Sequence, residues 1–412
     1  MRYELFIAVR YLRARRKQAF VSVITFISIL GVAVGVAALI IVQAVETGFF
    51  EELQDKILSG DPDLIVWNAL PARPLPDPVA ATGVVAALDG IIAVAPVILG
   101  NGLAVGAPGR EPAGVEIRGV DPEQETGITA VPDNMVLGSL HDLTPEAGGV
   151  VLGVDLAANL GVTVGDSIRL VIPQVRVSPL MPPLVRNRLF EVVGLFDLDF
   201  YQWDTTRAYL HIEDARRFLS RGGSGGISAL QVKVDRPERI PGAAAAVTAA
   251  LGDDYFVRTV MDRNADFFKA LRTEKVVMFL ALGLIILVAS LNIVSTLILM
   301  VMAKIGEIGA LMAMGARARG IVMIFMLQGV IIGIIGTTVG SLLGVGVCHV
   351  LDTYKLIRLA PEVYLIPAVP FHTGVGDVML AIGVALLVSF VATLYPAWRA
   401  ARLDPVEALH YE

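Results

Sequence analysis

Four long apolar runs limit what this 412-residue chain can fold into. They are residues 19–45, 276–303, 320–348 and 378–398, and none of them contains Asp, Glu, Lys or Arg. A helix needs about 20 apolar residues to cross a bilayer, and one charge at its centre would cost about 2.5–3.5 kcal/mol. The first run is longer than the roughly 7–15 apolar residues of a cleaved signal peptide, so we expect an uncleaved anchor. The sequence therefore predicts a membrane protein with four helical spans.

The composition supports the membrane class and argues against several others. The chain is 55% apolar, only 17% of its residues are charged, and its mean hydropathy is +0.69. A net charge of −6 provides no basic surface for nucleic acid. The one cysteine, Cys348, precludes an internal disulfide, and the five histidines are not at metal-ligand spacing. We therefore expect no metal and no nucleic acid at this chain.

The distribution of Lys and Arg predicts the orientation of the spans, because basic residues near span ends stay in the cytoplasm. Basic residues gather in 1–18, 304–319 and 399–412, so these three segments, with both termini, should be cytoplasmic. Residues 46–275 and the loop 349–377 should then lie outside, in the periplasm of a Gram-negative cell. In such a cell this orientation would place the chain in the inner membrane.

The long segment between the first two spans has the pattern of an α+β domain. Short β-type runs alternate with Gly, Pro and Asp, and helical patches occur between them. A proline-rich stretch, 173–183, should form a projecting loop between two strands, because proline cannot donate to a ladder. Its exposed Leu and Met side chains favour a docking hook, and a loop that packs on its own domain is the alternative. The β-type runs are 63–67, 114–120 and 168–172, and the helical patches are 213–219 and 242–251.

The motifs of nucleotide binding and acyl transfer are absent or out of context. The sequence contains no G-x-x-x-x-G-K-[ST] loop to hold a nucleotide phosphate. Residues 222–226 (GGSGG) match G-x-S-x-G, but a nucleophile elbow follows a strand, and these residues follow a helix end. We expect a flexible turn there, no catalysis by this chain and no cofactor bound to it.

Two patterns in the membrane part indicate close packing and a partner surface. Five glycines in the third run keep to one helix face, which favours either tight packing within the subunit or a face that slides during a cycle. Residues 302–316 have helical apolar spacing and end in Gly315, which predicts a short amphipathic helix with a glycine cap. This helix either contacts a cytoplasmic partner or lies on lipid headgroups. The five glycines are Gly329, Gly333, Gly336, Gly340 and Gly344.

The order of one span, a large domain and three spans resembles the LolC/LolE family of lipoprotein-releasing permeases, within the wider MacB/FtsX-like superfamily. The resemblance covers essentially the whole chain, and the terminal motif is shared across the superfamily. The residues that carry it are 8–13 (AVRYLR), 191–196 (EVVGLF), 273–275 (TEK), 291–295 (LNIVS), 315–316 (GA) and 395–409 (YPAWRAARLDPVEAL).

The resemblance implies a permease that works with a separate, LolD-like cytoplasmic ATPase, which binds the ATP and Mg. It implies extraction of outer-membrane lipoproteins from the inner membrane and transfer to a LolA-like periplasmic carrier. The second permease is either a LolE-like paralogue or another copy of this chain. The outer domain would divide into a Porter-like part, about 46–118 and 228–270, and a Sabre-like part, about 119–227.

The resemblance also implies sites. The proline-rich loop matches the position of a carrier-docking hook, and the cytoplasmic helix matches a coupling helix on the ATPase. The family commonly has Arg where this chain has Met312, so the resemblance does not support a specific salt bridge there, while the apolar docking face is kept. The hook residues are Pro179, Leu180, Met181, Pro182, Pro183 and Leu184, and the coupling residues are Glu307, Ile308, Leu311, Met312, Met314 and Gly315.

The mechanism that we expect follows from the energy of lipid extraction. Each acyl CH₂ that leaves the bilayer costs about 0.8 kcal/mol, so lipoprotein release needs work from the partner ATPase. We expect the first two spans to close a lateral lipid cavity that is lined by Phe26, Ile29, Val36 and Ile40. The alternatives are a MacB-like efflux permease and an FtsX-like regulator of a cell-wall hydrolase.

Overall fold

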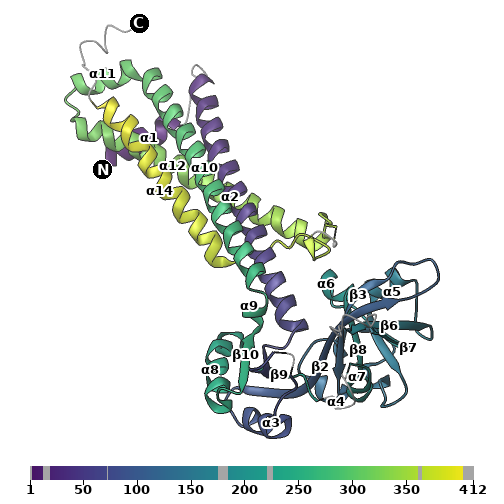
Figure 1. The fold of residues 1–412 in the computed structure, drawn as a ribbon. Coiled ribbons are helices and arrows are strands. Elements are labelled where there is room, and N and C mark those ends of the chain that lie inside the picture. Colours follow the sequence, from purple (N-terminus) through teal and green to yellow (C-terminus); the bar gives the residue numbers. More distant parts are fainter. Residues whose placement is uncertain are drawn as a thin grey trace. The chain divides into compact units, whose positions relative to one another are not determined.

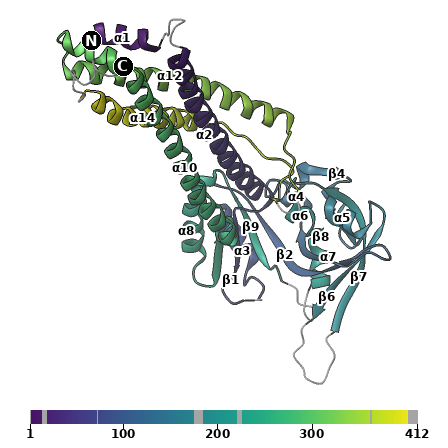
Figure 2. The ribbon, with the colours of Figure 1, turned by 90° about the horizontal axis from the view of Figure 1, so that it is seen from above.

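The fold is described from a computed structural model, which covers the chain except for residues 1, 13–18, 72, 175–183, 220–225, 361–363 and 402–412. The chain divides into two compact units (Figures 1 and 2). We call Met1–Glu51, Ala270–Arg358 and Ala368–Glu412 the helical unit, and Glu52–Lys269 with Leu359–Pro367 the α+β unit.

Long helices build the helical unit, and two of them continue into the α+β unit without a break. These two are α2 and α10, which cross the unit boundaries after Glu51 and before Ala270. The helices are α1 (Arg2–Leu12), α2 (Ala19–Gly60), α10 (Ala265–Ala303), α11 (Ile305–Ala313), α12 (Ala318–Tyr354) and α14 (Val375–Ala400).

The number of spans is three or four among the described residues. Thr25–Gly60, Ala318–Tyr354 and Val375–Ala400 are each long and apolar enough to cross a membrane. A fourth span is reached when Ile293–Ala303 and Ile305–Ala313, which meet at a 62° bend, are taken as one. The membrane character of the chain is thus confirmed, and the count of four stays a prediction.

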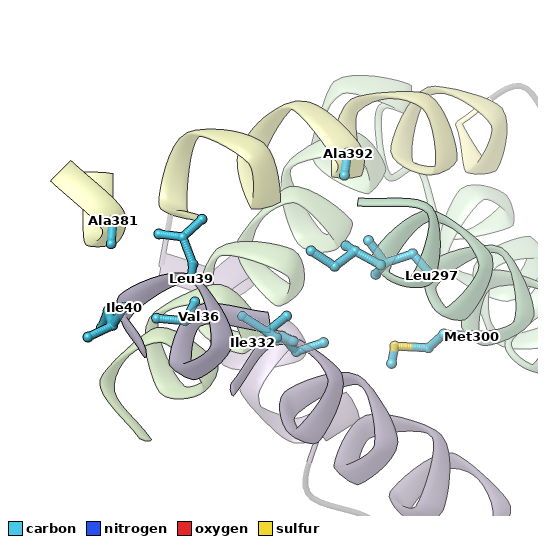
Figure 3. Close-up of a cluster of buried hydrophobic side chains, with 10 residues drawn as sticks. Val36, Leu39, Ile40, Leu297, Met300, Ile332, Ala381 and Ala392 are labelled. Atoms are coloured by element: carbon cyan, nitrogen blue, oxygen red, sulfur yellow. The ribbon is translucent and has the colours of Figure 1, made fainter. Parts of the chain in front are cut away.

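Apolar side chains from four helices form the centre of the helical unit. Figure 3 shows Val36, Leu39 and Ile40 of α2 in one cluster with residues of α10, α12 and α14. Leu297 and Met300 come from α10, Ile332 from α12, and Ala381 and Ala392 from α14. The unit therefore has a core of its own, to which α2 contributes through one face.

The α+β unit is built on a ten-stranded mixed sheet with the order β10-β1-β9-β2-β3-β8-β5-β7-β4, while β6 pairs with β2 and β7. The alternating runs of the sequence predicted this class, and the three β-type runs lie in β1, β3 and β6. The strands are β1 (Leu64–Asn68), β2 (Ile91–Val105), β3 (Ala113–Val120), β4 (Met135–Leu137), β5 (Gly149–Gly153), β6 (Ser167–Gln174), β7 (Leu184–Phe196), β8 (Arg207–His211), β9 (Ala229–Val234) and β10 (Tyr255–Thr259).

Strand β2 joins two parts of this sheet. Its first half pairs with β9, as at Ala95 and Gln231, and its second half pairs with β3, as at Asn101 and Glu116. Strand β3 also pairs in parallel with β8. The division between the two parts thus falls within β2, while the Porter-like and Sabre-like ranges remain a prediction.

Short helices cover the sheet and begin or end at the residues that the sequence provides. Asp77 caps α3 by accepting from the Ala80 amide, and Gly161 ends α5 in the left-handed region at φ 67°. The predicted helices at 213–219 and 242–251 are present as α7 and α8. The helices are α3 (Pro78–Ala86), α4 (Pro122–Glu125), α5 (Val154–Leu160), α6 (Tyr201–Asp204), α7 (Ile212–Leu219), α8 (Ile240–Leu251) and α9 (Val260–Arg263), with 3-10 turns at Pro132–Asn134, Leu140–Asp142 and Pro237–Arg239.

Candidate functional site

The glycines of α12 bring its backbone against two neighbouring helices. A Cβ on Gly333 would lie 2.8 Å from the Ser389 Cβ of α14, and one on Gly340 would lie 2.5 Å from the Ala33 carbonyl of α2. Gly329 faces Thr393 of α14 in the same way, and Gly336 and Gly344 face α2. We call these five residues the glycine seam. Their arrangement is that of tight packing within the subunit, the first of the two sequence interpretations.

A partly open apolar cavity lies between α2, α10 and α14 within the helical unit, with about 390 Å³ of empty space when its open side is included. Ser389 is its one hydroxyl-bearing wall residue, and the Ser389 Oγ is buried without a hydrogen-bond partner in the described part of the chain. The wall is formed by Val32, Gly35, Val36, Leu39, Ile285, Ile293, Ala381, Val384, Ala385, Val388 and Ser389. The cavity suits an alkyl chain, because its wall is apolar apart from Ser389 and carries no charged side chain.

The four residues expected to line a lipid cavity lie in different surroundings. Val36 lines the cavity and is also packed against Gly340. Ile40, which is labelled in Figure 3, is buried against Gly344, and Ile29 packs against the same hydrophobic cluster. Phe26 is 65% exposed on the surface of α2. The cavity that is present therefore includes one of the four side chains, and their role in lipid contact stays a prediction.

Helix α11 divides the expected coupling residues between its inner and outer faces. Ile308 is buried in a cluster with Ile324 and Phe325 of α12, and Leu311 and Met312 are partly buried at its edge. Met314 is 77% exposed, and the exposed Glu307 forms an ion pair with Lys304. The apolar stripe of this amphipathic helix thus holds the helix to its own subunit, and the surface open to a partner is narrower than the sequence indicated.

The end of α11 has the geometry of a glycine cap. Gly315 has φ 95°, its amide donates to the Met312 carbonyl at 3.0 Å, and the Ala316 amide donates to the Leu311 carbonyl at 3.0 Å. These two bonds satisfy carbonyls that the last turn would leave open. The structure of the helix end by itself therefore accounts for a glycine at position 315, without reference to a partner.

The predicted hook lies largely outside the described residues, since 175–183 include Pro179, Leu180, Met181, Pro182 and Pro183. Its flanking strands are described: β6 and β7 pair antiparallel from Ser167 with Glu191 up to Gln174 with Leu184. The two ends of the loop are therefore held together by a ladder, as expected for a loop between two strands. Most of the GGSGG turn at 222–226 also lies outside the described residues.

The α+β unit has a buried charged site that the sequence reasoning missed. It surrounds the C-terminal end of α2, where three successive backbone carbonyls accept hydrogen bonds from β9, from the loop after α4 and from β8. The Leu58 carbonyl accepts from Lys233 Nζ at 2.8 Å, the Ser59 carbonyl from the Ala130 amide at 2.9 Å, and the Gly60 carbonyl from Arg207 Nη1 at 2.7 Å. The positive charges of Lys233 and Arg207 at this end are also attracted by the negative pole of the helix dipole.

Asp61, which follows this helix end, is the common partner of three arginines. Its Oδ1 accepts from Arg118 Nη1 at 3.2 Å and from Arg207 Nη2, and its Oδ2 accepts from Arg263 Nη2. These residues come from β3, β8 and α9. We call the four residues the Asp61 junction. The Asp61, Arg118 and Arg207 side chains are less than a tenth exposed, and Arg263 is 14% exposed.

The charges of the Asp61 junction determine its protonation. Burial alone would raise the pKa of Asp61, but the guanidiniums of Arg207, Arg263 and Arg118 outweigh burial and hold that pKa at about 2. Asp61 is therefore ionised at neutral pH. Burial raises the pKa of the neighbouring Glu125, which accepts from Gln231 Nε2 at 2.9 Å and from Thr129 Oγ1 at 2.8 Å.

The aromatic ring of Trp203 closes this site from another side. The Arg207 guanidinium lies 4.1 Å from the centre of the Trp203 ring, and the ring lies so close to Gly60 that a Cβ there would overlap it. A signal for the site existed in the sequence. Arg118 and Glu116 are the two charged residues of a strand that is otherwise apolar or glycine, and a charge that such a strand buries needs a partner.

The Asp61 junction has the chemistry of a structural fastening. Its groups are one carboxylate and three guanidiniums that are already paired, and among the described residues no group of His, Cys, Asp or Glu side chains is arranged to hold a metal ion. Neither this site nor the apolar cavity brings together a nucleophile and a base. The arrangement holds elements in place, and the cavity offers space to an apolar chain.

Comparisons with known proteins match both parts of the chain. Family models match residues 25–250, as a MacB-like periplasmic core domain, and residues 279–405, as an FtsX-like permease C-terminal region. The lipoprotein-releasing system transmembrane protein LolC of Xylella fastidiosa is 34% identical over 98% of each chain, and that of Neisseria meningitidis is 34% identical over 99% of each. The transmembrane protein LolE of Haemophilus influenzae is 28% identical over 99% of each chain.

Proposed function

Because this chain belongs to the LolC/LolE family of lipoprotein-releasing transmembrane proteins, we propose that it is the permease subunit of an ABC transporter that extracts lipoproteins from the inner membrane. One observation carries the proposal. The 34% identity extends over 98% of both chains, so the relationship includes the helices and the α+β unit together. Full-length agreement of this kind favours lipoprotein release over MacB-like efflux and over FtsX-like regulation of a hydrolase.

The permease would span the inner membrane with the α+β unit in the periplasm and both termini in the cytoplasm. Two observations support this orientation. The basic residues gather in the segments 1–18, 304–319 and 399–412, and the family model that matches residues 25–250 is that of a periplasmic domain.

The work of extraction would come from a LolD-like ATPase that binds ATP and Mg itself. Helix α11 is the surface that we assign to it. Its exposed residues Glu307 and Met314 would contact the ATPase, while Ile308 would transmit the displacement to α12, against which it packs. Leu311, Met312 and Gly315 would keep the helix in position for this contact.

Lipid would be handled by the apolar side chains of α2 and α10. The acyl chains of a lipoprotein are held in the bilayer by about 0.8 kcal/mol per CH₂, so a route out must provide apolar contacts along its length. The cavity beside Val36 offers such contacts within the subunit. The exposed Phe26 would face lipid or the second permease, which is either a LolE-like paralogue or another copy of this chain.

A LolA-like periplasmic carrier would receive the lipoprotein at the loop between β6 and β7. The support is the antiparallel ladder of β6 and β7, which pairs Gln174 with Leu184 at the two ends of this segment. The sequence of this loop includes the apolar residues Leu180, Met181 and Leu184, whose side chains would form the docking surface for the carrier.

Reconstitution tests the proposal. The chain is placed in proteoliposomes with its ATPase, its second permease and a labelled lipoprotein, and soluble carrier is added outside. ATP should transfer label to the soluble fraction, and chelation of Mg should stop the transfer. Deletion of residues 180–184 should abolish carrier-dependent transfer while ATP hydrolysis continues. A complex that hydrolyses ATP but never moves lipoprotein to the carrier would rule out this function.

A further inference from the structure

Helices α2 and α10 are the two continuous helices shared by the units, so their ends in the α+β unit must bear any movement that they carry. Helix α2 ends there at Gly60, and α10 begins there at Ala265, directly after α9. A movement of either helix changes the α+β unit only if the helix end is fastened to the sheet. The contacts at these two ends therefore decide how well movement is transmitted.

The end of α2 is fastened at many points. Besides the three capped carbonyls, Lys56 Nζ donates to the Leu198 carbonyl at 3.0 Å. Asp63 accepts from Lys233 at 3.1 Å and from the Val234 amide at 2.8 Å. Leu53 and Ile57, which belong to the last turns of α2, are almost completely buried. The last turns of α2 are thus held by several strands and loops of the sheet at once.

The start of α10 is fastened at few points. Its lead-in helix α9 has a local capping box between Asp262 and Thr259, the last residue of β10, which pairs with Leu64 of β1. Two bonds connect α9 to the α2 end: the Val260 amide donates to the Asp63 carbonyl at 2.8 Å, and Arg263 donates to Asp61. Arg263 is thus a side-chain link between the lead-in of α10 and the residue that follows α2.

The two oxygens of Asp61 divide these connections. Oδ1 serves Arg118 and Arg207, which belong to the sheet, and Oδ2 serves Arg263. Loss of Arg263 would leave the Oδ1 pairs in place, so the sheet and the α2 end would stay joined. The lead-in of α10 would then be joined to the α2 end by the backbone alone, through the Val260–Asp63 hydrogen bond and the pairing of β10 with β1 at Thr259 and Leu64, with no side-chain link between Asp61 and α9.

We propose that Arg263 couples the two shared helices through Asp61, so that α2 and α10 move the α+β unit as one, and that this coupling is required for ATP-driven lipoprotein release. The inference rests on the proposed function for its last step. Arg263 acts as a positioning residue, since it contacts Asp61 and no substrate. Arg118 and Arg207 transmit the displacement to β3 and β8.

The test uses the complete reconstituted complex with R263Q, R263K and a matched control, R258Q. Arg258 is an exposed arginine of β10 that stacks on Phe256 and has no part in the junction. R263Q should lower the rate of release by about tenfold, in line with mutations along a coupling route, and leave ATP hydrolysis within about twofold of wild type. R263K keeps one cationic donor and should recover much of the release rate, and R258Q should match wild type.

Hydrogen exchange provides a readout that does not depend on lipoprotein. With and without a non-hydrolysable ATP analogue, the amides of β3 and β8 in the wild-type complex should differ in exchange, and this difference should disappear in R263Q. A nucleotide response that survives in R263Q, release at the wild-type rate, or an equal loss of ATP hydrolysis and release in R263Q would each overturn the coupling. A complex that responds to nucleotide through Arg263 and yet releases no lipoprotein would leave the coupling standing and contradict the proposed function instead.

Discussion

One helix, α2, is held by opposite chemistry along its two halves. In the helical unit it packs on the glycine seam, where Gly340 and Gly344 of α12 have no side chain and the α2 backbone approaches closely. In the α+β unit its last residues lie among charges, and Asp61 pairs with three arginines. The contact at the seam depends on the absence of side-chain volume, and the contact at the junction depends on side-chain charge.

The difference follows from the two solvents. Lipid tails are as apolar as a leucine, so burial from lipid provides little drive for helix association, and close van der Waals contact at small residues replaces it. A water-exposed domain has the hydrophobic effect available for its core and can hold buried charges when each is paired. We therefore expect the seam to be sensitive to volume and the junction to be sensitive to charge.

The largest effect should come from Asp61→Asn, which preserves volume and removes charge. It leaves three buried or nearly buried guanidiniums without their shared carboxylate, and breaking a buried pair in this way costs about 3–5 kcal/mol. Thermal unfolding of the full-length variant in mild detergent measures the loss. Asp55→Asn, on an exposed position of the same helix, is the control and should leave the unfolding temperature unchanged.

A double variant sharpens this result. If the cost of Asp61→Asn comes from uncompensated positive charge, adding R263Q should destabilise by less than the sum of the two single changes. Additive effects would mean that Asp61 stabilises the unit by packing, and the contrast between junction and seam would then be lost.

The second effect should come from Gly340→Ala, which adds volume and no charge. The new Cβ would lie 2.5 Å from the Ala33 carbonyl, so the α2 and α12 backbones must separate. Overpacking of this kind costs about 1–3 kcal/mol. Gly346→Ala on the same helix is the matched control, because a Cβ there meets nothing within 4 Å. Equal unfolding temperatures for the two variants would show that the glycine seam is not sensitive to added side-chain volume.

The sequence predicted the seam better than the junction, and the reason is periodicity. Glycines at spacings of three and four lie on one helix face wherever the helix is placed, so Gly329 to Gly344 could be assigned from the chain alone. The α+β class was predictable from the order of segments along the chain, since short β-type runs, which lie in β1, β3 and β6, alternate with Gly, Pro and Asp and with helical patches. Each of these inferences uses neighbours along the chain.

The Asp61 junction brings together residues that are far apart in sequence. Asp61, Arg118, Arg207 and Arg263 have no common spacing, and only the pairing of β3 with β8 and the position of α9 place them together. The coupling helix shows a related limit. Its apolar stripe was assigned to a partner, but an amphipathic pattern does not say which neighbour it contacts, and Ile308 packs within its own subunit.

The third prediction concerns a carboxylate that is buried without a cation. Burial raises the pKa of Asp204 to about 6, although its carboxylate accepts from the Leu198 and Phe200 amides at 3.0 and 2.9 Å. A raised pKa means that the folded state binds the proton more tightly than the unfolded chain. The resulting stabilisation is complete below about pH 4, the ordinary pKa of Asp, and is lost as the pH rises through about 6.

Asp204→Asn should remove this pH dependence. Between about pH 4 and pH 7 the wild type should lose about 1–2 kcal/mol relative to the variant, after allowance for partial solvent screening. The measurement is the difference in unfolding temperature between wild type and variant across that range, since other groups titrate equally in both. A constant difference would show that Asp204 does not titrate there, and burial of charge would then be as well tolerated at Asp204 as at Asp61.

The smallest effect should come from Asp199→Asn, which removes an ion pair at the outer edge of the same helix end. Asp199 is 66% exposed and lies 3.4 Å from Lys56 Nζ, while the bond from Lys56 to the Leu198 carbonyl does not need it. Its φ of 52° is tolerated by Asn, so the backbone gives no reason for strain. An exposed pair contributes about 0–1 kcal/mol and is screened by salt, so the variant should unfold within a degree or two of wild type and the gap should close further at about 1 M salt. A loss comparable to that of Asp61→Asn would mean that charge stabilises the end of α2 irrespective of burial, and the junction could no longer be distinguished from its surface.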